Sequence, residues 1–203
     1  AESDPRLSTY AVASAFAILL GGRTAWAAAR ASSYYLPVPT SAEDAASDER
    51  LAAYTRVDFY PLAMRRAAEL LANDTPPDAT VQTYGMDPYV LFLARRMSAT
   101  PYIYAYDLDA DAALAGSWEP AGPHPTPAQQ DVIRAMRDEH ERDLVARLER
   151  SPPAAFVFIG RSPLMVHADA LRDFEEHCPE ASAWMLLRYR EVGTFDDVRV
   201  WMR

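Results

Sequence analysis

Residues 151–160 read SPPAAFVFIG, and this stretch decides the fold. Its two prolines end any helix that precedes them, and the six residues Ala155 to Gly160 that follow are almost all apolar. A short continuous apolar run between turn signals is typical of a strand that is covered on both faces. We therefore predict that this strand lies at the centre of a sheet.

A long helix is predicted immediately before this strand, from Thr126 to about Glu149. We expect an apolar stripe along it to be buried, made of Val132, Ile133, Met136, Leu144, Val145 and Leu148. The stretch 137–150 (RDEHERDLVARLER) carries opposite charges at helical spacing, which favours a solvent-exposed face with i,i+4 ion pairs. A helix that docks on a partner protein is the alternative for this stretch.

Further strands flank the central one. They are predicted at Thr80 to Tyr84 (TVQTY), at Tyr102 to Tyr106 (YIYAY) and, as an antiparallel pair at a sheet edge, at Tyr189 to Val192 and Val198 to Met202. Helices are predicted over 57–71, 89–96, 169–178 and 179–186, with a short one after Tyr106. Strands separated by helices of this length indicate right-handed crossovers and a mostly parallel sheet. The predicted fold class is α/β, a three-layer Rossmann-like domain over residues 48–203 with an antiparallel C-terminal edge.

The N-terminal segment 1–36 is predicted to contain an apolar helix, and residues 37–47 (PVPTSAEDAAS) to form a linker. The apolar run Tyr10 to Gly22 is 13 residues long, whereas a bilayer-spanning helix needs about 20. A buried core helix and the remainder of a last membrane helix both fit this run, and the sequence leaves the two open.

Composition excludes several functions. The 203 residues have a net charge of −9, and a pI near 4.9 disfavours nucleic-acid binding because phosphate backbones would be repelled. The single cysteine, Cys178, excludes an internal disulfide and a cysteine-based zinc cage, and we expect it to be a packed small side chain.

Two loops at predicted strand ends are the places where an open α/β sheet would bind a ligand: Gly85-Met86-Asp87 and Gly160-Arg161-Ser162. Neither contains a glycine-rich phosphate cradle, so no nucleotide cofactor is expected. Asp87 followed by proline fits a helix N-cap better than a catalytic acid. Arg95 and Arg96 fit the C-terminal end of a helix, where the macrodipole and the free carbonyls favour positive charge, and the alternative is that one of them joins Arg161 in binding an anionic group.

The four histidines are the first candidates for metal ligands. His140 falls on the apolar stripe of the long helix, His124 lies in a proline-rich loop, and His177 has no partner at ligand spacing. His167 and Asp169 could place two ligands together, but the sequence completes no set of three or four. The alternating carboxylates of 107–111 (DLDAD) lack the glycine and glutamate of a calcium loop, so we expect a solvated loop there. No metal site and no catalytic residue are therefore predicted.

The order of these motifs resembles the C-terminal region of bacterial GT-C type membrane glycosyltransferases, of the dolichyl-phosphate-mannose protein mannosyltransferase and aminoarabinose transferase kind. The resemblance rests on TPPDATVQTYGMDPYVLFLARRMSATPYIY within Ala67 to Tyr104, on LERSPPAAFVFIG, and on the ending YREVGTFDDVRVWMR. It covers roughly residues 50–203, and the motifs are specific as an ordered set more than one by one.

The resemblance implies a non-catalytic extracytoplasmic domain on the periplasmic face of the bacterial inner membrane, because the family's catalytic acids lie in loops between early membrane helices. Its partners would be the rest of a polytopic enzyme and a lipid-linked sugar or an acceptor. The candidate binding residues are Tyr84, Gly85, Asp87, Arg95, Arg96 and Arg161. Two alternatives stay open: a free-standing soluble α/β enzyme or small-ligand-binding protein, and a protein-interaction module that presents the long helix.

Overall fold

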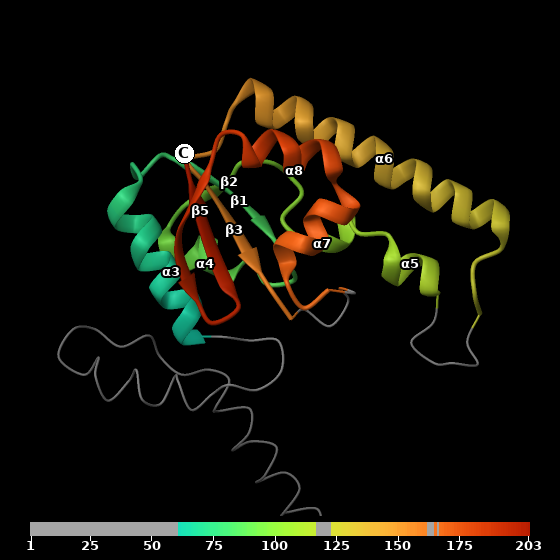
Figure 1. Ribbon diagram of the computed structural model, residues 1–203, viewed down its shortest axis with the longest axis horizontal. Helices are drawn as coiled ribbons and strands as arrows, with labels where there is room; N and C mark the ends of the chain where they lie inside the picture. Colours follow the sequence, from blue (N-terminus) through green and yellow to red (C-terminus); the bar gives the residue numbers. More distant parts are fainter. Residues whose placement is uncertain (1–60, 117–122, 162–164, 166) are drawn as a thin grey trace, which may run out of the picture. The chain divides into compact units, whose positions relative to one another are not determined.

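The structure is a computed structural model that describes residues 61–116, 123–161, 165 and 167–203 (Figure 1). The predictions for the N-terminal helix and for the linker lie outside the described residues. No helix in the part of the chain that is described is both long and apolar enough to cross a membrane.

The described residues form an α/β domain around a mixed five-stranded sheet. Its strands, in the order in which they pair, are β2 (Met97–Ser98), β1 (Thr80–Tyr84), β3 (Ala155–Ile159), β5 (Val198–Met202) and β4 (Arg190–Phe195). The sheet is parallel from β2 through β1 to β3, and antiparallel from β3 through β5 to β4. The central position predicted for the AFVFIG strand is confirmed, and so is the antiparallel C-terminal edge.

Helices pack on both faces of this sheet (Figure 1). They are α3 (Pro61–Asp74), α4 (Tyr89–Ala94), α5 (Asp111–Ala115), α6 (Pro127–Arg150), α7 (Ala170–His177) and α8 (Pro179–Leu186), with a short 3-10 turn, η2, at Ala105–Asp107. One apolar core lies under α3 and α4, and the other lies under α6, α7 and α8. Two cores on opposite faces explain why every residue of β3 is buried.

The alternation of side chains along the strands determines what each core contains. Phe156 and Phe158 point to the α7 and α8 side together with Tyr84, and they form an aromatic cluster there. Val157 and Ile159 point to the opposite side, where the small residues of α3 leave room for close helix packing.

The prediction of a strand over 102–106 is wrong. The strand next to β1 is formed instead by Met97 and Ser98, and residues 105–107 belong to the 3-10 turn η2. Side chains of β1 explain the difference, because Gln82 donates a hydrogen bond to the carbonyl of Tyr102 (2.7 Å) and Thr83 donates one to the carbonyl of Ile103 (3.1 Å). The segment is held beside the sheet by side chains rather than by a backbone ladder.

The long helix is confirmed, including its start, but the prediction of its buried stripe is only half right. Thr126 closes a capping box with Gln129 at the N-terminus of α6. Leu144 and Leu148 are buried and Val145 is half-buried, whereas Val132 and Met136 are 58% and 53% exposed. The N-terminal half of α6 extends past the rest of the domain (Figure 1), so its apolar residues have no core to enter.

A buried histidine and carboxylate cluster as the candidate functional site

The two glycine loops singled out in the sequence meet at the carboxyl edge of the sheet. Tyr84 pairs with Phe158 in parallel register, so the loops that follow β1 and β3 are neighbours. Gly85 has φ +143°, and a Cβ at this position would lie 2.6 Å from the carbonyl oxygen of Ile159. The backbone of Gly85 packs closely against Ile159, and glycine allows this contact because it has no Cβ.

Among the other predicted binding residues, Asp87 and Arg96 have structural partners. The Asp87 carboxylate accepts the backbone N–H of Tyr89 at 2.9 Å, at the start of α4, and partial burial raises its pKa despite this hydrogen bond. The buried Arg96 guanidinium donates to the carbonyls of Ala72 (3.2 Å) and Thr75 (2.7 Å) at the end of α3. Arg96 therefore caps the C-terminus of α3.

The remaining two arginines are on the surface. Arg95 is exposed and takes a left-handed backbone conformation (φ 53°) at the end of α4. Arg161 is also left-handed (φ 52°), and its 65%-exposed side chain forms an ion pair with Asp197 at 3.1 Å. Among the predicted binding residues, Arg95 and Arg161 are therefore the two whose side chains an anionic ligand could contact from solvent.

Tyr84 leads from the strand end to a polar cluster inside the domain. Its ring packs edge-on against Phe174 with centroids 4.9 Å apart, and its hydroxyl donates a hydrogen bond to Asp173 at 2.9 Å. Both side chains are buried. Burial, together with the neighbouring Asp173 charge, raises the pKa of the Tyr84 hydroxyl well above its usual value, so it remains a hydrogen-bond donor.

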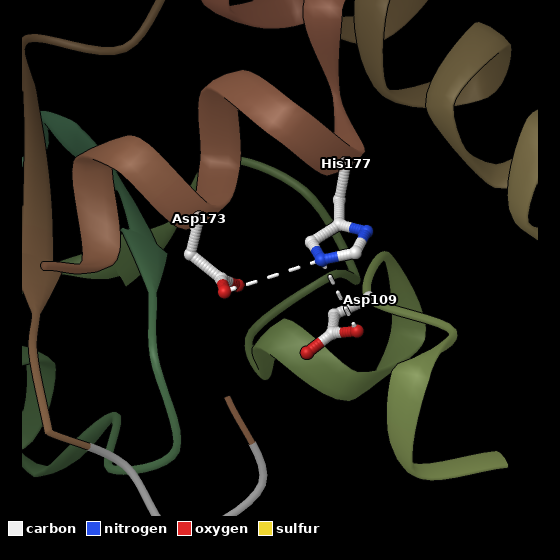
Figure 2. Close-up of side chains that lie close together, drawn as sticks. All are labelled: Asp109, Asp173 and His177. Atoms are coloured by element: carbon white, nitrogen blue, oxygen red, sulfur yellow. Dashed lines mark ion pairs between the residues drawn. The ribbon is translucent and has the colours of Figure 1, made fainter. Parts of the chain in front are cut away.

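The cluster consists of Asp109, Asp173 and His177 (Figure 2). Asp173 and His177 are four residues apart on α7 and therefore share a face of that helix, whereas Asp109 comes from the loop between η2 and α5. The three residues are 3%, 0% and 8% exposed. His177 Nε2 lies 3.6 Å from Asp109 Oδ1 and 4.0 Å from Asp173 Oδ1. Asp111 joins them at the rim, with a carboxylate oxygen 3.2 Å from the same nitrogen.

Backbone groups hold the two buried carboxylates in place. Asp109 Oδ1 accepts the N–H of Asp111 at 2.7 Å, and Asp173 Oδ1 accepts the N–H of His167 at 3.2 Å. The loop that carries Asp109 is fixed in turn, because the His140 ring nitrogen Nδ1 lies 2.7 Å from the carbonyl oxygen of Asp107. The carboxylates are thus positioned by backbone N–H groups, and each also has an oxygen within 4.0 Å of His177 Nε2.

The electrostatics of the cluster are unfavourable without a compensating charge. Burial raises the pKa of Asp109 to about 6, although the Asp111 N–H and the nearby His177 both act to lower it. His177 Nε2 is buried and makes no hydrogen bond within the described residues, despite three carboxylate oxygens within 4.0 Å. Such a site can bind a cation or exchange a proton.

Sequence analysis missed most of this cluster. The prediction of a solvated loop over 107–111 is wrong for Asp109, which is 3% exposed. The prediction that His177 has no partner at ligand spacing is wrong, because Asp173 stands one turn before it on the same helix. His167 and Asp169, the possible pair of metal ligands, have different partners in the structure. Asp169 accepts the N–H of Leu171 at the start of α7, and His167 pairs with Glu176 at 2.5 Å.

The cysteine prediction is confirmed. Cys178 is buried in the same core, and burial raises the pKa of its thiol well above the usual value, with a further contribution from the nearby Glu141 carboxylate. The thiol therefore has no thiolate character at neutral pH.

Comparisons of the chain with protein-family models, with curated proteins and with solved structures gave no match. The resemblance to the glycosyltransferase domain therefore stays a prediction that rests on the order of the sequence motifs.

Proposed function

We propose that this chain is a non-catalytic extracytoplasmic C-terminal domain of a bacterial membrane glycosyltransferase that uses lipid-linked sugar donors, and that it serves as an accessory or acceptor-binding domain. The observation that carries the proposal is the ordered set of motifs. Its first part spans β1 and α4, its second ends in β3, and its third covers β4 and β5. The motifs thus coincide with the parallel core and the antiparallel edge of one sheet. The finer description as a Rossmann-like domain belongs to this proposal and is supported by the parallel trio β2, β1 and β3.

The surface at the carboxyl edge of the sheet supports a binding role for the domain. Arg161 lies directly after this edge with a largely exposed guanidinium, and Arg95 is exposed at the end of α4. An arginine on the surface can bind a phosphate or a carboxylate in a bidentate manner. Lipid-linked sugar donors carry phosphate, so an anionic group of the donor or the acceptor is the ligand that this edge would meet.

The test is to express the intact native gene and to ask whether its product fractionates with membranes after a high-salt or carbonate wash. We expect several apolar segments of about 20 residues upstream of this domain and an integral membrane protein. In the same protein, Arg161→Gln should raise KM for the acceptor or the donor, while Arg142→Gln on the exposed face of α6 serves as the matched control. A product that is released by the wash, or one without upstream apolar segments, would overturn the proposal.

A second candidate is a free-standing enzyme or small-ligand-binding protein, and the buried polar cluster beneath Tyr84 is the observation that favours it. A ligand at 100 times its Kd stabilises the folded state by about 2.7 kcal/mol, so a thermal-shift screen with sugars, nucleotides and organic acids would detect it.

A third candidate, an interaction module, is favoured by the exposed Val132 and Met136 on α6. A chain that stays monomeric and recovers no partner in a pull-down would exclude it.

A further inference from the structure

We propose that Asp109, Asp173 and His177, with Asp111 at the rim, form a binding site for one divalent transition-metal ion. The inference rests on the geometry of the cluster and is independent of the glycosyltransferase proposal, because it concerns residues inside this domain alone.

The spacing of the donor atoms fits a metal ion. One ligand atom from each of Asp109, Asp173 and His177 lies within 4.8 Å of the others. Metal–nitrogen and metal–oxygen bonds of about 2.1 Å place adjacent octahedral ligands about 3.0 Å apart, tetrahedral ligands about 3.4 Å apart and opposite octahedral ligands about 4.2 Å apart. The separations of 3.2, 3.6 and 4.0 Å between His177 Nε2 and the three carboxylate oxygens fall in this interval.

The histidine provides a second observation that points to a ligand. His177 is 8% exposed, and its Nε2 is directed at the carboxylates (Figure 2) without making a hydrogen bond within the described part of the chain. A buried polar atom without a hydrogen bond destabilises the folded state, so such atoms usually have a partner. A metal ion placed between Nε2 and the carboxylates would accept the nitrogen lone pair and would also neutralise the buried negative charge.

The surroundings match what a metal site requires beyond its ligands. The Tyr84 hydroxyl, at 2.9 Å, and the His167 N–H, at 3.2 Å, each hold one oxygen of Asp173. The Asp111 N–H does the same for Asp109. Groups of this kind fix the orientation of metal-binding carboxylates and raise the affinity of the site.

The donor set also selects the class of ion. Ca²⁺ and Mg²⁺ favour all-oxygen sites, whereas an imidazole suits Zn²⁺, Mn²⁺, Fe²⁺ and related ions. Three carboxylates beside one imidazole favour Mn²⁺ or Zn²⁺, and the cluster contains no cysteine sulfur, which disfavours Cu⁺.

The experiment uses the 203-residue chain after treatment with a chelator, titrated separately with MnCl₂, ZnCl₂, CoCl₂, MgCl₂ and CaCl₂. We expect one equivalent of Mn²⁺ or Zn²⁺ to bind, and we expect Tm to rise by about 5–10 °C when the free metal reaches 100 times its Kd. The Co²⁺ protein should develop visible absorption bands, which report on the ligand environment without any substitution. No stoichiometric binding of Mn²⁺, Zn²⁺ or Co²⁺, or binding of Mg²⁺ or Ca²⁺ alone, would overturn the proposal.

Variants assign the ligands. Asp109→Asn and His177→Gln should each weaken binding about 100-fold or more. Asp107→Asn, from the same loop, and His124→Gln, an exposed histidine in the loop before α6, are the matched controls and should retain binding within about threefold, less than the effect of removing a group that only orients a ligand. Circular dichroism of each variant establishes that it is folded.

If a variant fails to fold, the imidazole ¹⁵N shifts of the wild type on addition of Zn²⁺ test the proposal instead, because the proposal requires His177 and not His167 to respond. Equal losses in the variants and their controls, or a response of His167 instead, would contradict it.

Discussion

Replacing Glu141 with alanine should destabilise the domain strongly, although this residue lies in the charged stretch predicted to be a solvated helix face. Glu141 is 8% exposed, and its Oε1 accepts the N–H groups of Glu180 (2.8 Å) and Ala181 (3.4 Å) at the start of α8. Pro179 has no N–H, and the N–H of Ser182 is bonded to the carbonyl of Cys178. One carboxylate from α6 therefore satisfies both of the unpaired amides that begin α8.

The magnitude follows from these contacts. A hydrogen bond to a charged acceptor contributes about 1.5–3 kcal/mol, and a carboxylate at a partly buried helix N-terminus adds up to about 2 kcal/mol that overlaps with it. We expect Glu141→Ala to lower the free energy of unfolding by about 3 kcal/mol, which corresponds to a fall in Tm of about 6–12 °C for a domain of this size. Glu141→Gln keeps an oxygen acceptor but loses the charge, so it should cost about half as much.

Urea and thermal unfolding followed by circular dichroism measure both variants. Glu139→Ala is the matched control, because Glu139 is an exposed glutamate two residues earlier on the same helix. Its effect should stay within about 0.5 kcal/mol, as for most surface substitutions. If Glu141→Ala and Glu139→Ala unfold at the same urea concentration with the same slope, the reasoning that Glu141 caps α8 is refuted.

Three further substitutions test other parts of the fold. Gly85→Ala should cost about 2–4 kcal/mol, because φ +143° disfavours a side chain and the new Cβ would meet the Ile159 carbonyl; a loss under 1 kcal/mol in urea unfolding would contradict this. Arg96→Lys should cost about 1–3 kcal/mol, because an ammonium cannot reproduce the forked contacts of the guanidinium with the end of α3, and an unchanged urea midpoint would argue against that role. Partial burial alone would raise the pKa of Glu191, but hydrogen bonds, chiefly from Arg199 (3.0 Å), lower it below its usual 4.5. Its contribution is therefore complete above pH 4.5 and is lost as the pH falls through the lowered pKa. Glu191→Gln should cost about 0.5–1 kcal/mol at pH 7 and nothing near pH 2, and a cost that is equal at both pH values would exclude the ion pair as its cause.

The elements that were predicted correctly are those whose signal lies within a short stretch of chain. The apolar run at Ala155–Ile159, between prolines and a glycine, can be satisfied only by burial on both faces, and it forms the central strand. The capping residue Thr126 before Pro127 likewise marks the start of α6 from adjacent residues alone. Local chemistry of this kind needs no knowledge of the rest of the fold.

The strand predicted over 102–106 failed for the opposite reason. Tyrosine and isoleucine have high β propensity, but propensity is only a measure of how well a side chain fits a pleated surface. The edge of β1 was taken by Met97 and Ser98, a pair with no strand pattern, and residues 102 and 103 were bound by the side chains of Gln82 and Thr83. A polar side chain in a buried strand was the available signal, since a buried glutamine requires partners.

The candidate site also consists of polar side chains on buried elements. Tyr84 was singled out because it ends a strand, yet its importance comes from its hydroxyl, which meets Asp173 eighty-nine residues later in the chain. Asp173 and His177 share a helix face, and this is visible in the sequence, but only the fold brings Asp109 to them. Burial then changes the chemistry, because a carboxylate that would be an ordinary surface group has a pKa of about 6 when it is enclosed. A carboxylate and a histidine one turn apart on an otherwise apolar helix face are therefore better evidence of a buried polar site than a run of carboxylates in a loop.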